Sequence, residues 1–505
     1  MAPGHPAAVP IRWALMATLS VLGAGAGSAV TGCGREPVEP SSLPNIVLIV
    51  ADDLGWSEVG SYGNAAVRTP AIDRLAAEGV LFERAYSVTP SCSASRAALL
   101  TGRYPHTNGV ISLLQWHTRA HRKRHAMRAL RTHRHSLNRG EIILPQDLKK
   151  LGYHTAIIGK WHVSIEKAES WGFDQRLQMA DRRSEALEAP FFLYYNPTHT
   201  HQPFRSDPEH PYDPSEVVLP PYFNENRELR YDLAEYYSAI SSMDREIGRI
   251  LEWLDRENLA DDTLVVFTSD NGPPYARAKA TLYEWGVREP LIFRHPGAFE
   301  GGRRTAALAS TLDIYPTLLD LIGRPIPDRR QGASLRPYLD DPSAAGREAL
   351  FLESNYHVFY TPGRAVRSGR WKYIRNFNVD APFYTQLEAV GLMLLKHPLP
   401  VPPRTREELY DLETDPLEGD NLAADPAHAA VLASMRSRLD AWMQQTDDDP
   451  RREFAIEPRR AESWEGGWFG PHVSPAPNRR ETWADYRQRI REARRKPAPP
   501  RAAAD

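Results

Sequence analysis

From residue 45 onward, the chain alternates short apolar runs with polar turns and with segments of helical periodicity. The run at 46–50 (IVLIV) is apolar at every position and rich in β-branched residues, which predicts a parallel strand buried on both faces. Apolar runs at 154–158, 191–195 and 263–267 predict three more strands of the same kind.

Helical signals lie between these strands. Thr69 and Pro70 have the residue types of a helix N-cap and of the first helical position, and Gly79 has that of a helix end. Between 229 and 254, apolar residues recur mainly at three- and four-residue steps, which predicts one long amphipathic helix. Strands that alternate with helices predict an α/β fold with a doubly wound, mostly parallel sheet.

The pattern changes after about residue 342. The segments 364–367 and 371–374 flank a Ser-Gly pair and predict an antiparallel hairpin, and 429–443 carries the apolar stripe of a helix. We therefore expect a main domain over 45–342, a smaller C-terminal α+β domain over 343–450, and an Arg- and Pro-rich, partly disordered extension over 451–505.

Residues 1–33 have the character of a secretory signal peptide, because Arg12 precedes a short run of small and apolar residues. The run ends at Val30-Thr31-Gly32-Cys33, which resembles the lipobox of bacterial lipoproteins, where the cysteine is lipidated. An ordinary secretory signal with an unrelated cysteine is the alternative. We expect an exported bacterial lipoprotein, periplasmic or at the cell surface, with 34–44 as a tether and the membrane reached only through a lipid anchor at Cys33.

Composition narrows the possible partners. The 505 residues include 62 basic and 64 acidic side chains, so no global field favours nucleic acid as a partner, and anion binding requires a local cluster. Hydrophobic residues make up 42% and charged residues 25%, the balance of a globular protein. The two cysteines, Cys33 and Cys92, cannot form a disulfide framework or a zinc cluster.

Polar groups follow each of the four predicted strands. Because open α/β sheets bind ligands at the carboxyl ends of their strands, we expect these groups to share one rim. Four of them have oxygen-bearing side chains, which suit calcium or magnesium better than zinc: Asp52, Asp53, Asp270 and Asn271. Four others predict a cationic ring around a compact anion such as a sulfate or phosphate ester: Lys160, His162, His201 and Lys279.

The segment 91–96 (SCSASR) precedes an apolar helical run and offers a nucleophile. Cys92 would lie at a helix N-terminus, where backbone N–H groups favour negative charge. A buried, unreactive cysteine is an equally good interpretation of this segment by itself.

Several separated motifs resolve that choice. CSASR followed by AALLTGRYP resembles the signature of the type I sulfatases, in which the cysteine is oxidised to formylglycine. Further matches are NIVLIVADDLG at 45–55, GKWH at 159–162, H-x-P at 201–203, SDNG at 269–272, the lysine at 279, and ELYDLETDPLEGDNLA at 408–423. The resemblance spans about 45–450 and implies an alkaline-phosphatase-like sulfatase fold.

The resemblance also implies roles for individual residues. Cys92, matured by a formylglycine-generating enzyme, would supply the attacking hydroxyl and would join Asp52, Asp53, Asp270 and Asn271 as a calcium ligand. Arg96 and Lys160 would hold the hydrate, and His162 would remove its second proton. Lys279 and His201 would grip the sulfate, with His201 preferred over His199 as the acid for the leaving group. The third signature position is Ala94, where many members have proline, the residue that the maturation machinery of aerobic hosts prefers.

Within this family, the layout is closest to the heparan N-sulfatases (sulfamidases), on softer matches at 106–110, 191–201, 212–223 and 355–377. We therefore expect a sulfatase that acts on sulfate esters or sulfamates of sulfated sugars, with N-sulfoglucosamine as the preferred substrate and His357 as a further substrate contact. The alternatives are an O-sulfatase on another glycan, a phosphodiesterase of the same superfamily, and a glycan-binding lipoprotein with an unmatured cysteine.

One insertion departs from that layout. Residues 117–139 contain eight Lys or Arg and five His in 23 positions. This segment is either a basic lid that grips a polyanionic glycan or a solvated insertion whose charges keep it soluble.

Overall fold

The computed structural model describes residues 43–114, 136–179, 187–223, 227–357, 360–379 and 404–450. The predicted signal peptide, most of the tether, most of the basic insertion (117–135) and the extension at 451–505 lie outside the described residues. Among the described residues, no helix is both long enough and apolar enough to cross a membrane.

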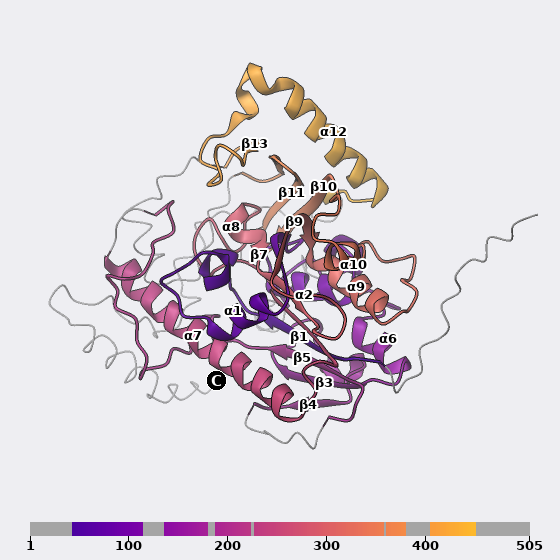
Figure 1. The fold of residues 1–505 in the computed structure, drawn as a ribbon. Helices are drawn as coiled ribbons and strands as arrows, with labels where there is room; N and C mark the ends of the chain where they lie inside the picture. The colour runs from indigo at the N-terminus through magenta and orange to yellow at the C-terminus, as the bar shows by residue number, and fades with distance from the viewer. Residues whose placement is uncertain are drawn as a thin grey trace, which may run out of the picture. The chain divides into compact units, whose positions relative to one another are not determined.

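A nine-stranded sheet lies at the centre of the described chain (Figure 1). Its path is β4-β3-β5-β1-β6-β8-β2-β7, and β9 pairs with β2. The strands are β1 (Asn45–Ala51), β2 (Val80–Tyr86), β3 (His154–Gly159), β4 (Gln175–Leu177), β5 (Phe191–Asn196), β6 (Thr263–Ser269), β7 (Arg288–Glu289), β8 (Leu291–Arg294) and β9 (Arg303–Ser310).

Pairing is parallel from β4 to β6 and between β2 and β9, and antiparallel at β8 and β7. The expectation of a mostly parallel sheet is therefore confirmed, and all four predicted strands are present. The sequence patterns did not indicate the other five strands. Of these, β4, β7 and β8 have only two to four residues and are too short to show a periodicity. The longer β2 and β9 carry charged residues, Glu83 and Arg84 in β2 and Arg303 and Arg304 in β9, which interrupt their apolar runs.

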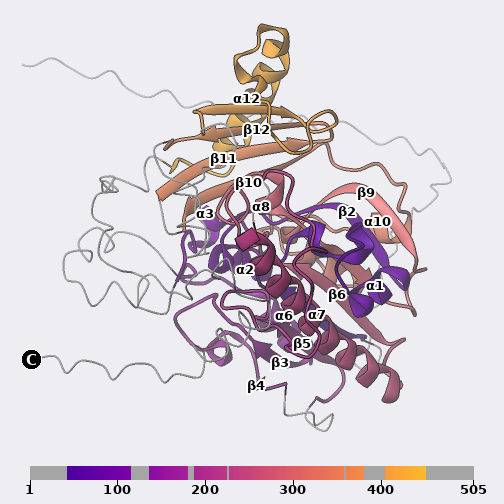
Figure 2. The same ribbon diagram turned by 90° about the vertical axis from the view of Figure 1, so that its left-hand side faces the viewer.

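Helices cover both faces of this sheet, as a doubly wound fold requires. Alternate residues of β1 point to opposite faces. Val47 and Ile49 pack in one core with α1 (Pro70–Ala77) and the long helix α7 (Arg227–Arg256), which Figure 2 shows running along the sheet. Ile46, Leu48 and Val50 of β1 pack in a second core with α2 (Cys92–Thr101), α6 (Leu144–Lys150), α9 (Ile314–Leu321) and α10 (Arg336–Asp340).

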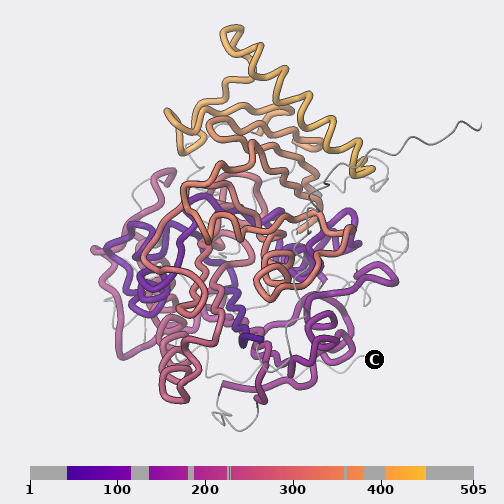
Figure 3. Tube along the Cα trace, turned by 45° about the vertical axis from the view of Figure 1, so that its right-hand side comes forward, coloured from indigo at the N-terminus to yellow at the C-terminus, as the bar shows by residue number. Residues whose placement is uncertain are grey.

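A separate four-stranded antiparallel sheet follows in the chain, drawn in orange to yellow in Figure 3. Its strands are β10 (Ala349–Tyr356), β11 (Tyr360–Ser368), β12 (Trp371–Asn376) and β13 (Glu407–Asp411). The predicted hairpin is β11 and β12, which pair antiparallel. Helix α12 (Ala429–Gln445) packs Leu432, Met435 and Leu439 against this sheet in a shared core with Val366 and Tyr373.

The register of the main sheet brings four strand ends to one edge. Ala51 at the end of β1 pairs with Ser269 at the end of β6, and Gly159 at the end of β3 pairs with Asn196 at the end of β5. Because β5 also pairs with β1, the residues that follow all four strands emerge together.

Candidate active site

Acidic and amide side chains meet where β1 and β6 end. Asp52 and Asp53 follow β1 directly, and Asp270 and Asn271 follow β6. The backbone N–H of Asp53 donates to Asp270 Oδ1 at 3.1 Å, and Asn271 Nδ2 donates to Asp53 Oδ1 at 2.8 Å. All four side chains are buried. The structure thus brings together the four strand-end residues that the sequence grouped as metal ligands.

Cys92 joins this group as the first residue of α2. Its Sγ lies 3.8 Å from Asp53 Oδ1, and ligand atoms of Asp52, Asp53, Cys92 and Asp270 all lie within 4.8 Å of one another. Burial raises the pKa of the Cys92 thiol to about 12. The thiolate form of Cys92 is therefore disfavoured at neutral pH.

These residues also fit a hard divalent cation. Three carboxylates converge, and the buried Oδ1 of Asn271 has no hydrogen-bond partner among the described residues. A buried acceptor without a donor is costly, and a cation satisfies it. Oxygen-only donor sets are preferred by calcium and magnesium.

Each of the three carboxylates has its own cationic partner. Lys160 Nζ lies 2.7 Å and 2.8 Å from the two oxygens of Asp52. Lys279 Nζ lies 2.7 Å from the Asp53 carboxylate, and Arg96 Nε donates to Asp270 Oδ2 at 2.7 Å. Arg96 Nη2 also lies 3.7 Å from Asp52 Oδ1, so the guanidinium of Arg96 contacts two of the three carboxylates.

The charge balance differs between the carboxylates. Burial would raise the pKa of Asp52, but Lys160, His201 and Arg96 together hold it well below its usual value. Burial raises the pKa of Asp270 to about 7, although Arg96 opposes that rise. Asp270 therefore needs additional positive charge to stay fully ionised near neutral pH.

His162 follows β3 in a left-handed conformation, with φ 54°. Neither of its ring nitrogens has a hydrogen-bond partner among the described residues. Burial, and then the charge of Lys160, hold the pKa of His162 well below its usual value. Burial and the neighbouring lysine therefore favour the neutral form of His162.

The two candidate histidines after β5, His199 and His201, contact different carboxylates. His201 Nε2 lies 3.9 Å from Asp53 Oδ2, and its Nδ1 lies 2.7 Å from the carbonyl oxygen of Gln202. His199 Nε2 instead lies 3.5 Å from Glu246 on α7. Burial lowers the pKa of His201, although Asp52 and Asp53 oppose that shift. His201, and not His199, faces the carboxylate cluster.

His357 follows β10 of the second sheet and is buried. Burial holds the pKa of His357 well below its usual value, and the charges of Lys279, His201 and Lys160 lower it further. His357 therefore faces the same cationic cluster, although it lies far from these residues in the chain.

The sequence analysis did not identify three side chains that support this site. Thr200 Oγ1 donates to the Asp52 carbonyl oxygen at 2.6 Å, and the Tyr236 hydroxyl donates to the Asp53 carbonyl oxygen at 2.7 Å. Arg96 Nη1 donates to Asn196 Oδ1 at 2.5 Å. Asn196 and Thr200 could have been suspected from their place after an apolar strand. Tyr236 lies within the apolar stripe of α7 and gave no such signal.

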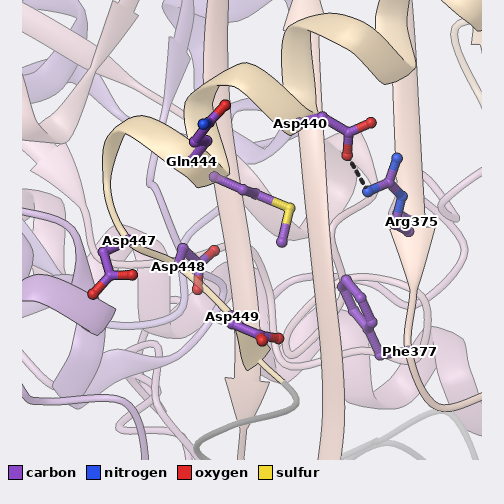
Figure 4. Close-up of a pocket in the computed structure, with 8 residues that line it drawn as sticks. Arg375, Phe377, Asp440, Gln444, Asp447, Asp448 and Asp449 are labelled. Atoms are coloured by element: carbon purple, nitrogen blue, oxygen red, sulfur yellow. Dashed lines mark hydrogen bonds and ion pairs between the residues drawn. The ribbon is translucent and has the colours of Figure 1, made fainter. Parts of the chain in front are cut away.

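A cavity of about 450 Å³ lies elsewhere, between β12 and the end of α12 (Figure 4). Arg375 and Asp440 form an ion pair of 2.5 Å at its edge. Its lining has four carboxylates, from Asp440 and Asp447–Asp449, and neither a cysteine nor a histidine. A lining with four carboxylates and one arginine does not favour a sulfate or phosphate.

Comparison with family models identifies the chain. The model described as Sulfatase matches residues 44–183 and 177–324, which include Cys92 and every rim residue described above except His357. The chain belongs to the sulfatase family. A second model, described as N-sulphoglucosamine sulphohydrolase, C-terminal, matches residues 277–389 of this sulfatase.

Individual proteins agree with this assignment. N-sulphoglucosamine sulphohydrolase of Homo sapiens is 30% identical over 478 residues, covering 80% of this sulfatase and 90% of the relative. An ulvan-active sulfatase of Formosa agariphila is 28% identical over 434 residues, covering 81% of each chain. A solved structure in complex with its substrate D-glucosamine-2-N,6-O-disulfate has a TM-score of 0.60 at 20% identity, covering 81% of this chain and 99% of that one.

The expected fold and enzyme class are therefore confirmed: this chain is a sulfuric ester or sulfamate hydrolase with the sulfatase fold. Sulfatases generally use a formylglycine and a divalent metal ion. The site of this sulfatase has a buried cysteine, converging oxygen ligands and a surrounding set of cations, which suit those two groups and an anionic substrate.

Proposed function

We propose that this sulfatase hydrolyses the sulfate esters or sulfamates of sulfated sugars, with N-sulfoglucosamine as its preferred substrate. The observation that carries the proposal is the position of Cys92, whose Sγ lies 3.8 Å from Asp53 and shares one buried cluster with Asp52 and Asp270. Two lysines border the cluster, so an incoming sulfate meets positive charge on both sides.

The residues around position 92 could hold the two groups that sulfatases generally use, a formylglycine and a divalent metal ion. Formylglycine hydrate at position 92 would supply two hydroxyls, one as the nucleophile toward sulfur and one whose proton could be removed to release the sulfate. Asp52, Asp53, Asp270, Asn271 and the side chain at 92 would hold a calcium ion, with magnesium as the alternative, and the ion would draw charge from the sulfate oxygens.

The remaining residues of the site transfer protons or bind the anionic substrate. His162 is the base for the second hydroxyl, because neither of its ring nitrogens is engaged by another described residue. His201 protonates the leaving group, since the negative charge of a bound sulfate raises the pKa of this histidine above its value in the free enzyme. Lys160, Lys279 and His357, whose charges or positions influence one another, contact the sulfate or sugar. Arg96 orients Asp270 through a hydrogen bond to its carboxylate.

The choice of sugar rests on the relatives. The human relative is an N-sulphoglucosamine sulphohydrolase, and the model of that enzyme's C-terminal region matches the segment that contains His357. The match to the ulvan-active relative covers 81% of this chain, against 80% for the human relative, so an O-sulfated glycan is the second candidate.

Two other functions are weaker. A phosphodiesterase of the same superfamily would carry a serine or threonine where this chain has Cys92, together with ligands for a second metal ion beside the first. A glycan-binding protein without catalysis would keep an unmodified Cys92. The mass of the peptide that contains Cys92, from the native host, separates this last possibility from an enzyme, because maturation converts the thiol to an aldehyde.

The protein is further proposed to be exported and lipidated at Cys33, on the lipobox-like sequence at 30–33. Its partners are then a sulfated saccharide, a formylglycine-generating enzyme and a membrane reached only through the lipid.

The decisive experiment is sulfate release from N-sulfoglucosamine, with the conversion of Cys92 measured on the same sample. Cys92→Ala is the blank, and Asp270→Asn, which keeps the size of the side chain, should also lose turnover. Release supports the proposal. If fully converted enzyme releases no sulfate from N-sulfoglucosamine but does so from O-sulfated sugars, the N-sulfated preference is wrong.

A further inference from the structure

Lys279 lies in a backbone segment with left-handed residues on both sides. Arg277 has φ 64° and Ala280 has φ 65°, and neither is a glycine. Left-handed conformations are unfavourable for residues with a Cβ and persist only where the surroundings enforce them. The Lys279 side chain is buried, and its Nζ lies 2.7 Å from Asp53. This backbone conformation therefore bears directly on where the Lys279 ammonium lies.

The enforcing contact comes from the loop after β13, 141 positions along the chain. The guanidinium of Arg277 donates to the backbone carbonyl oxygen of Glu418, and to that of Leu417 at 3.3 Å. It also lies 4.1 Å from the ring centroid of Tyr283. Arg277 is buried, so these contacts fix its side chain in one place.

The loop that receives Arg277 is itself fixed. Glu418 is buried and left-handed, with φ 55°. One oxygen of its carboxylate accepts the backbone N–H of Glu284 at 2.6 Å, and the other lies 3.0 Å from Lys372 Nζ on β12. Lys372 also lies 3.1 Å from Glu284. Glu418 therefore holds the segment that carries Lys279 at both ends, at Arg277 and at Glu284.

We propose that Arg277 and Glu418 are positioning residues for Lys279, through which the second sheet sets the place of an active-site cation. The inference rests on the proposed function, in which Lys279 contacts the sulfate. Without the Arg277–Glu418 contact, the segment relaxes toward ordinary backbone angles and Lys279 loses its fixed place beside Asp53.

The test is a double-mutant cycle on sulfate release. Arg277→Met keeps the stem over Tyr283 and removes the donors, and we expect it to lower kcat/KM about tenfold or more. In a Lys279→Ala background, the same substitution should change kcat/KM by less than about twofold, because the residue through which Arg277 acts is already absent. A role in general stability would lower activity in both backgrounds.

Arg288→Met is the matched control. The partly buried Arg288 guanidinium lies 3.9 Å from the Trp56 ring centroid and donates to the Glu83 carbonyl oxygen at 2.6 Å, the same two kinds of contact as Arg277 but with partners outside residues 277–284. We expect this variant to lower the melting temperature but to leave kcat/KM unchanged. Where Arg277→Met is insoluble, Arg277→Lys, which keeps the charge but not the fork of donors, is measured in the same two backgrounds.

Three results are informative. An effect of Arg277→Met that disappears in Lys279→Ala supports the inference. Equal losses in both backgrounds overturn it and leave the proposed function standing. A Lys279→Ala variant with full sulfate release removes Lys279 from the proposed mechanism, and the inference fails with it.

Discussion

The hydroxyl of Tyr236 on α7 donates a hydrogen bond of 2.7 Å to the backbone carbonyl oxygen of Asp53. Asp53 has φ 65°, a left-handed angle that costs free energy for a residue with a side chain. Tyr236 lies 183 positions away and is buried, so the contact ties the longest helix of the fold to the residue on which Cys92, Asn271 and Lys279 converge. Helix α7 therefore holds the left-handed backbone of Asp53 in place, and with it the position of the Asp53 carboxylate.

Replacing Tyr236 by phenylalanine tests this relationship. We expect Tyr236→Phe to lower the free energy of unfolding by about 1–3 kcal/mol, because the buried carbonyl oxygen of Asp53 loses its donor. Calcium affinity, measured by titration calorimetry, should fall roughly tenfold, since Asp53 is less firmly oriented. Tyr237→Phe is the control, because its hydroxyl contacts Asn64 and Val218 rather than Asp53. Equal calcium affinities in both variants would contradict the assigned role.

Calcium binding should depend on pH through Asp270. Burial raises the pKa of Asp270 to about 7, so without an added cation this carboxyl is largely protonated below that pH. A cation binds the ionised form and releases the proton, so affinity should rise with pH up to about 7 and level off above it. The same raised pKa makes the metal-free fold less stable as pH rises from about 4 to about 7, because the folded state then holds a proton that the unfolded chain has lost.

The measurement is the melting temperature with and without calcium. The gain from calcium should be larger at about pH 8 than at about pH 5.5, and a chelator should remove it at both values. Asp270→Asn removes the titrating group, so the gain in that variant should be small at every pH. A wild-type gain that is independent of pH would remove Asp270 from the metal site.

The strand-end chemistry was predictable from the sequence because parallel strands impose a simple rule. Apolar runs at 46–50 and 263–267 identify buried strands, and their carboxyl ends must share an edge if the sheet is doubly wound. Asp52, Asp53, Asp270 and Asn271 could thus be grouped without a structure. The motif around Cys92 then selected the family.

The supporting contacts were not predictable in that way. Tyr236 belongs to a helix whose apolar periodicity marks it as core, and nothing in that periodicity indicates that its hydroxyl reaches Asp53. Arg277 and Glu418 meet through one guanidinium and one backbone carbonyl. Such contacts depend on the packing of segments distant in the chain, which residue patterns within a single segment do not encode.

Proline at position 94 should improve maturation in an aerobic host. Ala94 is the third residue of α2, and the first turn of a helix has N–H groups without intrahelical partners, so proline removes no helical hydrogen bond there. We expect Ala94→Pro to raise the converted fraction of Cys92, measured by peptide mass, while kcat per converted site stays the same. A folded variant with unchanged conversion would show that Ala94 does not limit maturation.

The last prediction concerns the contact between α3 (Pro105–Asn108) and β10. His106 Nδ1 pairs with Glu353 Oε2, and the His106 backbone N–H donates to Glu353 Oε1 at 3.0 Å. Burial alone would lower the pKa of His106, but the Glu353 carboxylate raises it above 6.5. Burial alone would raise the pKa of Glu353, but the charge and the hydrogen bond of His106, together with the charge of Arg364, lower it.

The sign of the stability effect follows from these two shifts. The stability that the fold gains from protonated His106 is fully present below about pH 6.5 and is lost as pH rises through the raised pKa of His106. The stability gained from ionised Glu353 is lost as pH falls through the lowered pKa of Glu353. His106→Gln should therefore lower the melting temperature most near pH 6 and progressively less toward about pH 9. His428→Gln is the control, since His428 pairs with Asp425 at the surface, where an ion pair contributes little. A constant difference between wild type and His106→Gln across that range would mean that the pair carries no net charge interaction.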